Sequence, residues 1–232
     1  MGEFIIASMI AALATGLGAV PVLFFQHTTH KWRDILLAFT AGVMVAASTF
    51  ELIPESLQMS SFITVGIGMF IGVVVLTILE KKIPHIDLEH TQTNIAFDKK
   101  ALLIIAAITL HNLPEGLSVG VSYGSGLEGL GPLIAFAIGL QNIPEGFLVA
   151  LFLVQQSVRK IKALVIATLT GAVEIVTAII GYFLTAYVAN LVPLGLSFAA
   201  GAMLYIVYKE LIPESHGDGH ATSATYSFII GL

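Results

Sequence analysis

The sequence contains no cysteine and is poor in charged residues. Without cysteine the chain has neither disulfide bonds nor thiolate metal ligands. Charged residues make up 11% of the 232 residues, against roughly 25% in an average soluble domain. Residues of the hydrophobic set make up 56%. This balance predicts an all-α polytopic membrane protein.

Several functional motifs are absent as well. The sequence has no glycine-rich phosphate loop, no H-E-x-x-H motif and no nucleophile elbow, which argues against ATP-driven transport and against common hydrolases. We also expect no nucleic-acid partner. The first Lys or Arg is Lys31, so the N-terminal apolar run lacks the basic segment of a cleaved signal, and we interpret it as a membrane span.

Apolar runs of about 20 residues predict eight transmembrane helices in one transmembrane domain covering residues 1–232. Their expected ranges are 4–25, 35–57, 62–79, 101–122, 132–155, 163–187, 193–212 and 222–232. The last run, from Ala221 to Leu232, provides only about 18 Å of helix against a hydrocarbon core of about 30 Å. We expect a truncated last helix, the alternative being a helix that inserts half way.

The basic residues predict the orientation of the chain. All ten Lys and Arg residues lie between spans one and two, three and four, or five and six, or at the end of span seven. The connections 58–61, 123–131 and 188–192 carry none. By the positive-inside rule the basic side is cytoplasmic. We therefore expect a multi-pass protein of the cell inner (plasma) membrane with its N-terminus outside.

Two segments in opposite halves of the chain repeat each other. Residues 38–57 read AFTAGVMVAASTFELIPESL, and residues 198–216 read FAAGAMLYIVYKELIPESH. They fall in spans two and seven, which cross the membrane in opposite directions. Inverted repeats of this kind are common in secondary transporters, with the binding site at the midplane. The simplest arrangement is 3+2+3: three helices, a central pair and three helices related to the first three.

A second repeat lies in the middle of spans four and five. Residues 111–116 read HNLPEG, and residues 141–146 read QNIPEG. An interior proline frees the carbonyl four residues earlier, here Leu110 and Leu140. A carboxylate at bilayer depth costs a few kcal/mol unless it is paired, hydrated or bound to a cation. Both features are unfavourable in a plain span, which indicates a functional site.

Helical spacing places two potential ligands on one face of each of these spans. His111 lies one turn from Glu115, and Gln141 lies one turn from Glu145. If the two faces meet, they supply an imidazole nitrogen, an amide oxygen and two carboxylates. This mixed nitrogen and oxygen set suits a divalent metal ion.

A second, oxygen-only site is predicted beside the first. Asn112 and Asn142 are rotated by about 100° from the first pair of faces, and Glu174 lies deep in span six. With Glu115 and Glu145 shared, these residues form a second ligand set. Polar contacts between helices are the alternative for the whole group, but three carboxylates in a low dielectric repel one another without a cation. For the asparagines, a hydrogen bond at a helix kink is an equally good explanation.

The paired motifs resemble the fourth and fifth helices of the ZIP (Zrt/Irt-like) metal transporters. Gln141, where much of that family has His, resembles the bacterial GufA-like branch. The resemblance implies a binuclear metal centre, with residues 171–174 (GAVE) matching a G-x-x-E motif of the sixth helix. Ile175 departs from the proline of many relatives. The resemblance also implies an elevator-like movement of spans one, four, five and six against the others.

Further acidic and histidine residues lie toward the ends of the spans. The repeated E-L-I-P-E-S segments contribute Glu51, Glu55, Glu210 and Glu214, which we interpret either as interfacial carboxylates or as a funnel for cations. On the predicted cytoplasmic side, Glu214, His216, Asp218 and His220 suggest an auxiliary metal site. Polar loop composition is the better explanation for His27, His30, His85 and His90.

These patterns predict an uptake transporter for divalent transition metal, most favourably Zn²⁺, with Cd²⁺, Mn²⁺ and Fe²⁺ as further substrates. The expected partners are divalent metal ions, the lipid bilayer and a second copy in a homodimer. Small faces at Gly16, Gly18, Gly42 and Gly201 are expected to let helices slide closely. Two alternatives are a metal-ion channel and an intramembrane metal-dependent hydrolase, with Glu115 or Glu145 as general base. We do not predict an enzyme.

Overall fold

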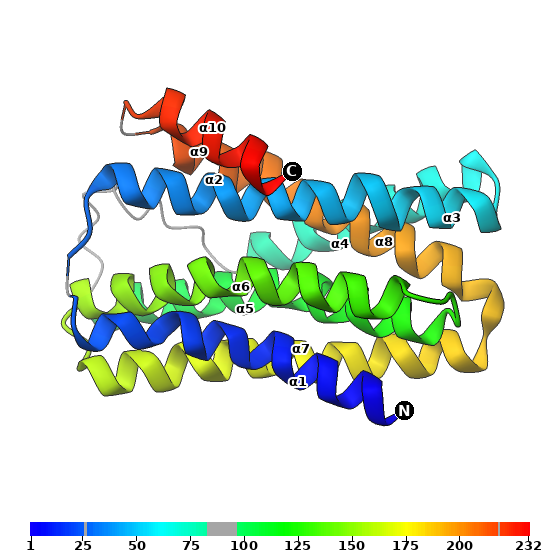
Figure 1. Ribbon diagram of the computed structural model, residues 1–232, viewed down its shortest axis with the longest axis horizontal. Helices are drawn as coiled ribbons and strands as arrows, with labels where there is room; N and C mark the ends of the chain where they lie inside the picture. The colour runs from blue at the N-terminus through cyan, green and yellow to red at the C-terminus, as the bar shows by residue number, and fades with distance from the viewer. Residues whose placement is uncertain (26, 83–96, 218) are drawn as a thin grey trace.

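The computed structural model describes residues 1–25, 27–82, 97–217 and 219–232, and every regular element in them is a helix (Figure 1). In chain order the elements are α1 (Gly2–Ala19), the 3₁₀ turn η1 (Val20–Leu23), α2 (His30–Ala46), the π-helical turn η2 (Ala47–Leu52), α3 (Ile53–Met59), α4 (Phe62–Lys82), α5 (Phe97–Gly124), α6 (Leu130–Gln155), α7 (Lys160–Tyr187), the 3₁₀ turn η3 (Ala189–Leu191), α8 (Val192–Ile206), the π-helical turn η4 (Val207–Leu211), α9 (Ile212–His216) and α10 (Ala221–Gly231).

Seven stretches of the described chain are long and apolar enough to cross a membrane. They are Gly2–Leu23, His30–Met59, Phe62–Lys82, Ala101–Gly124, Leu130–Gln155, Lys160–Tyr187 and Ala189–His216. The eighth run forms α10, whose 11 residues are too few for a full span. The chain is therefore an all-helical integral membrane protein with seven candidate spans in its described residues.

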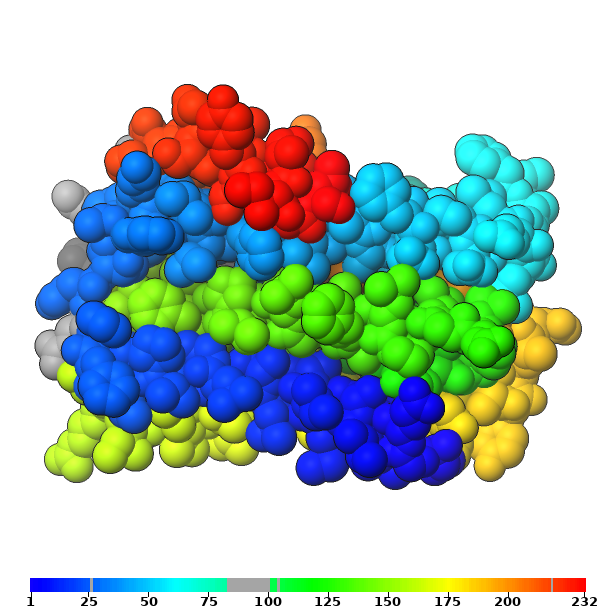
Figure 2. Space-filling view, in the orientation of Figure 1, coloured from blue at the N-terminus to red at the C-terminus, as the bar shows by residue number. Residues whose placement is uncertain are grey.

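The helices pack in two groups. Figure 1 shows α1, α5, α6 and α7 together in the lower part of the molecule, and α2, α4, α8, α9 and α10 in the upper part. The groups meet where α5 contacts α8 and where α2 contacts α6. The space-filling view in Figure 2 shows α10 lying on the outside of α2, where Ser227 Oγ donates a hydrogen bond to the carbonyl oxygen of Ile35 at 2.7 Å.

Glycines bring helices of the first group into close contact. A Cβ atom on Gly116 or Gly120 of α5 would overlap the backbone of α7, and one on Gly18 or Gly146 would overlap the backbone across the α1–α6 contact. In lipid, association of helices depends on such van der Waals packing, because apolar burial provides no driving force there. The helices carrying the two proline motifs are thus held firmly to α7 and α1.

The second group uses glycine in the same way. Gly201 lies against the backbone of Met69 on α4, and Gly42 lies against the backbone of Phe228 on α10. Gly16 and Gly18 likewise contact α7 and α6 of their own group. Gly16, Gly18, Gly42 and Gly201 therefore do lie at close helix contacts, each inside one group, and the expectation that helices slide on these faces stays a prediction.

The close contacts give a direct test of the packing. Gly120→Leu places a side chain where the backbone of Ala178 lies, whereas Gly66→Leu extends into open space on α4. Overpacking costs about 1–3 kcal/mol or more, so we expect Gly120→Leu to lower Tm by about 5 °C or more. Gly66→Leu is the control and should change Tm by less than about 1 °C. Equal Tm values for both variants in detergent would contradict the packing.

Candidate metal centre

The two proline motifs lie where the two helix groups meet. α5 and α6 continue as helices through Pro114 and Pro144, so the spacing of one helical turn between His111 and Glu115, and between Gln141 and Glu145, is kept. Glu115 and Gln141 are fully buried, and the other two are partly exposed to a cavity. The motifs therefore present a polar surface inside the bundle.

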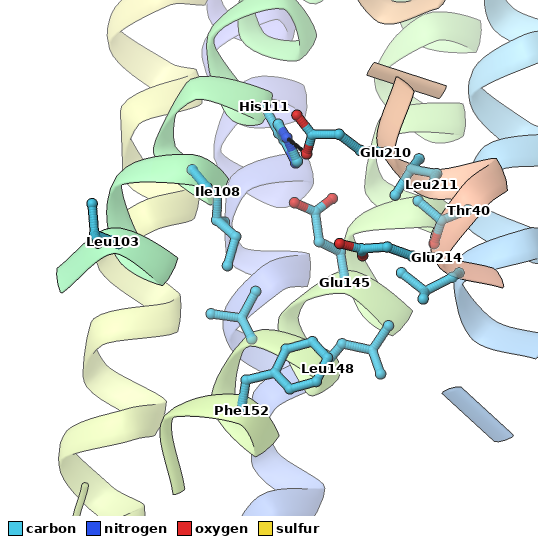
Figure 3. Close-up of a pocket in the computed structure, with 13 residues that line it drawn as sticks. Thr40, Leu103, Ile108, His111, Glu145, Leu148, Phe152, Glu210, Leu211 and Glu214 are labelled. Atoms are coloured by element: carbon cyan, nitrogen blue, oxygen red, sulfur yellow. Dashed lines mark ion pairs between the residues drawn. The ribbon is translucent and has the colours of Figure 1, made fainter. Parts of the chain in front are cut away.

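His111 is bound by a residue from the second group. Its Nε2 lies 2.7 Å from Oε2 of Glu210, a carboxylate on the π-helical turn η4. Figure 3 shows the imidazole and this carboxylate facing each other above Glu145. The pair joins α5 to η4 and hence links the two groups of helices.

A cavity of about 80 Å³ opens beside this pair. Its polar lining consists of Thr40, His111, Glu145, Glu210 and Glu214, and the remaining lining side chains are apolar (Figure 3). On α5 the lining residues precede His111, and on α6 they follow Glu145. Because these two helices run antiparallel, the cavity leads from the motifs toward the end of the bundle that carries the α1–α2 and α6–α7 connections (Figure 1).

Five buried acceptor oxygens at the motifs have no hydrogen-bond partner in the described part of the chain. They are both carboxylate oxygens of Glu115, Oδ1 of Asn112, Oε1 of Gln141 and Oε1 of Glu145. Glu115 is buried and lies close enough to Glu145 and Glu174 for their charges, when ionised, to act on it, so the three carboxylates repel one another unless a cation or protons neutralise them. Burying acceptors and charges without partners is costly, and a cation satisfies both demands at once.

A second polar group lies deeper, around Asn142. Its Nδ2 is 2.9 Å from each carboxylate oxygen of Glu174 and 2.9 Å from the carbonyl oxygen of Ala11 on α1. Its Oδ1 accepts a hydrogen bond of 2.9 Å from Nε2 of Gln141. Asn142 therefore makes hydrogen bonds here, whereas the amide atoms of buried Asn112 have no partner among the described residues.

The residues around these groups fit a metal ion in kind, although their present positions do not form a finished site. Within the described residues, no three His, Asp or Glu side chains already converge on one point. The donor set of imidazole nitrogen and carboxylate and amide oxygens suits Zn²⁺.

Comparison with known proteins identifies the family. The profile of the ZIP zinc transporter family matches residues 81–231. The chain belongs to the ZIP zinc transporter family. It is 36% identical to zinc transporter GufA of Myxococcus xanthus, over all of this chain and 96% of the relative. It is 33% identical to zinc transporter ZIPB of Bordetella bronchiseptica, over all of this chain and 79% of the relative, and 32% identical to zinc transporter ZupT of Streptococcus mutans, over 98% and 92%.

Membership of the ZIP family settles the class of activity. ZIP proteins are membrane transporters, so this chain is a transporter and not an enzyme. The alternative of an intramembrane hydrolase is thereby set aside. The buried carboxylates of Glu115 and Glu145 are accordingly considered below as metal ligands and not as general bases.

Among the described residues, the expected auxiliary ligands Glu214, His216 and His220 do not form a cluster that could hold a metal ion. Glu214 lines the cavity, while Nδ1 of His216 lies 3.0 Å from the carbonyl oxygen of Ile212 in its own helix. Nδ1 of His220 lies 3.2 Å from Oδ2 of buried Asp34 on α2. His216 and His220 are thus directed to different partners. Asp218, His85 and His90 lie outside the described residues.

Glu210 is the residue whose part in the centre the sequence analysis missed. The seventh span was predicted to end at 212, so Glu210 was interpreted as an interfacial carboxylate or as part of a funnel for cations, and not as a partner of His111. In the structure η4 and α9 continue the helix to His216, which places Glu210 inside the bundle and only 7% exposed. The repeated E-L-I-P-E-S segment was the available signal, but it gives no information about which side chain Glu210 contacts.

The hydrogen bonds of Asn142 lead to a prediction about metal-dependent stability. Asn142→Asp replaces the donor to Glu174 by a second carboxylate, so the metal-free protein should lose about 5–10 °C in Tm. A divalent cation between the carboxylates offsets this loss, and Zn²⁺ or Cd²⁺ should raise Tm more than in the wild type. Asn190→Asp, at an exposed position in η3, is the control. An unchanged metal-free Tm in Asn142→Asp would refute the prediction.

Proposed function

We propose that this ZIP protein takes up divalent transition metal, mainly Zn²⁺, and moves it toward the cytoplasm through a binuclear centre at the bilayer midplane. The observation that carries the proposal is the set of buried acceptor oxygens without donors on Glu115, Gln141 and Glu145. The names of the relatives point to zinc. The oxygen-rich ligand set also suits Cd²⁺, Mn²⁺ and Fe²⁺.

The proposed centre has two sites that share Glu115 and Glu145. The first adds His111 and Gln141. The second adds Asn112, Asn142 and Glu174. The interaction of Glu115 with both Glu145 and Glu174 supports a shared position between the two sites.

A 3+2+3 inverted repeat with α10 as an eighth helix is part of the proposal. In such a repeat α1 corresponds to α7, α2 to α8, α4 to α10 and α5 to α6. The contact between α1 and α6 should then have its counterpart between α7 and α5. The contact between α4 and α8 should have its counterpart between α10 and α2. All four contacts are present. The repeated glycines Gly42 and Gly201 also make equivalent close contacts, and a π-helical turn precedes each repeated proline. These equivalences support the repeat.

An elevator-like movement is supported by the way the two groups pack. With Gly195 against Val121 as the exception, the close glycine contacts between described helices fall inside one group or the other. Each group is therefore expected to keep its internal packing, while the boundary between α5 and α8 and between α2 and α6 changes. We propose that α1, α5, α6 and α7 move together and carry the metal.

The proposed orientation places the basic end of the bundle in the cytoplasm and the N-terminus outside, in the inner (plasma) membrane. The cavity then faces the cytoplasm, with Glu210 and Glu214 on the route out and Glu51 and Glu55 in a funnel at the other end. Exposed large side chains on the spans, such as Phe70 and Phe136, suit contact with lipid. The proposal includes a homodimer, which chemical cross-linking in membranes tests.

Substitution of the shared and unshared ligands tests the centre. Glu115→Ala removes a ligand from both sites and should lower uptake at least about tenfold, since even supporting residues contribute about 10–100-fold. Glu174→Ala affects the second site alone and should leave a working carrier with altered metal affinity. Uptake of Zn²⁺, Cd²⁺, Mn²⁺ and Fe²⁺ into proteoliposomes at matched protein amounts measures both, with exposed Glu128→Ala as control. Wild-type uptake by Glu115→Ala would refute the central site.

Acidity provides a second test of the same ligands. His111 must be neutral and the glutamates ionised to bind a metal, so protons compete with it. Lowering the pH from 8 to 5 should therefore reduce uptake, and the apparent KM should rise. The carboxylates of Glu210, Glu145 and Glu214 lie close enough to His111 for their charges to act on it. A flat profile over this range would contradict ligation by these groups.

A further inference from the structure

Lys209 is the neighbour of Glu210 in the chain, but its ammonium group is directed to another helix. Nζ of Lys209 forms an ion pair with Oε1 of Glu80 at the end of α4. It also lies 3.1 Å from the hydroxyl oxygen of Tyr205 and 5.3 Å from the centre of its ring. The Tyr205 hydroxyl in turn donates a hydrogen bond of 2.6 Å to Oε2 of Glu80. Glu80 therefore binds both partners, one with each oxygen.

Lys209 also differs in depth from the other basic residues of the spans. The Lys and Arg residues in the other six candidate spans lie in the first or last turn of the span. Lys209 lies about two turns before the end of its span at His216. Its backbone is adjacent to that of Glu210, while its ammonium, on a side chain that is 44% exposed, reaches Glu80 in the last turn of α4.

The π-helical turn η4 separates the two neighbouring charges. Glu210 faces α5 and lines the cavity, whereas Lys209 faces α4 and is absent from the residues that line it. The charged residues that line the cavity are His111 and three glutamates. A pathway for divalent cations requires this negative potential, because it raises the local concentration of the ion.

We propose that Glu80 is a positioning residue for metal transport, which neutralises Lys209 and holds it away from Glu210. The inference rests on the proposed function, and it assigns to a residue outside the centre the task of keeping the route electronegative. A lysine has a long, flexible stem and a compact charge. Without Glu80 its ammonium is left beside the acidic cavity without its counter-ion, where it repels the metal and competes for Glu210.

Exchanges of the two charges give opposite effects that a purely structural ion pair does not predict. Glu80→Gln leaves a net positive charge and should raise the KM for Zn²⁺ about 3–10-fold, more at low ionic strength. Lys209→Met leaves a net negative charge and should lower KM or leave it unchanged. The double variant Glu80→Gln/Lys209→Met restores neutrality, and its KM should lie within about twofold of the wild type. Vmax per folded transporter should change by less than about twofold throughout.

The measurement is the initial rate of Zn²⁺ uptake into proteoliposomes at two ionic strengths. Tyr205→Phe removes a hydrogen bond but no charge, so its KM should stay within about twofold of the wild type, which makes it the matched control. A KM unchanged in Glu80→Gln, or a double variant as impaired as Glu80→Gln, would overturn the proposal. If Glu80→Gln does not fold, Lys209→Met still tests the proposal. We expect an unchanged or lowered KM in Lys209→Met, so a raised KM would overturn the proposal.

Failure of this inference is distinct from failure of the proposed function. Glu115→Ala in the same assay reports on the metal centre alone. If Glu115→Ala is inactive while the charge exchanges leave KM unchanged, the centre stands and the role of Glu80 is refuted. If Glu115→Ala transports like the wild type, the proposed centre fails before Glu80 is considered.

Discussion

The polar centre is organised around the buried carboxylate of Glu115. Both of its oxygens lie inside the helix bundle, and the neighbouring Gln141 amide directs Nε2 to Oδ1 of Asn142. In a soluble protein such a group is solvated or paired, and in lipid the cost of leaving it alone is larger. The two proline motifs bring their glutamates, Glu115 on α5 and Glu145 on α6, to the same part of the bundle, and the glycine contacts hold these helices in place. In the proposed function, a bound cation supplies the positive charge that offsets these carboxylates.

Close packing allows this centre to remain polar. Gly116 and Gly146 stand immediately after the two motif glutamates, and each lies against a backbone, of α7 and of α1 respectively. A larger residue there would separate the helices and admit lipid or water. In each motif the glycine thus packs its helix against a neighbour in the same group. The glutamate one residue earlier points in a different direction from this contact. Packing and chemistry are fixed by adjacent residues in the P-E-G sequence.

The sequence predicted the features that depend on local pattern. Apolar runs predict spans because a span must satisfy its backbone internally over about 20 residues, and the pairing of His111 with Glu115 on one face follows from helical spacing. Contacts with the main chain, such as that of Asn142 with the carbonyl oxygen of Ala11, cannot be predicted from residue type, because every residue has a backbone carbonyl. The separation of His216 from His220 depends on turn geometry, and the pairing of Glu210 with His111 depends on a π-helical turn. None of these follows from composition or periodicity.

The pair between His111 and Glu210 relates the centre to movement of the helix groups. Nε2 of His111 is the atom that contacts Glu210, and the same nitrogen cannot make this contact and ligate a metal at the same time. In the proposed function the metal therefore competes with Glu210 for His111. The contact joins α5 of one group to η4 of the other, so a metal that takes His111 also removes a link between the groups. A ligand shifts a conformational equilibrium only through a difference in its interactions with the two states, and exchange of this one partner supplies such a difference.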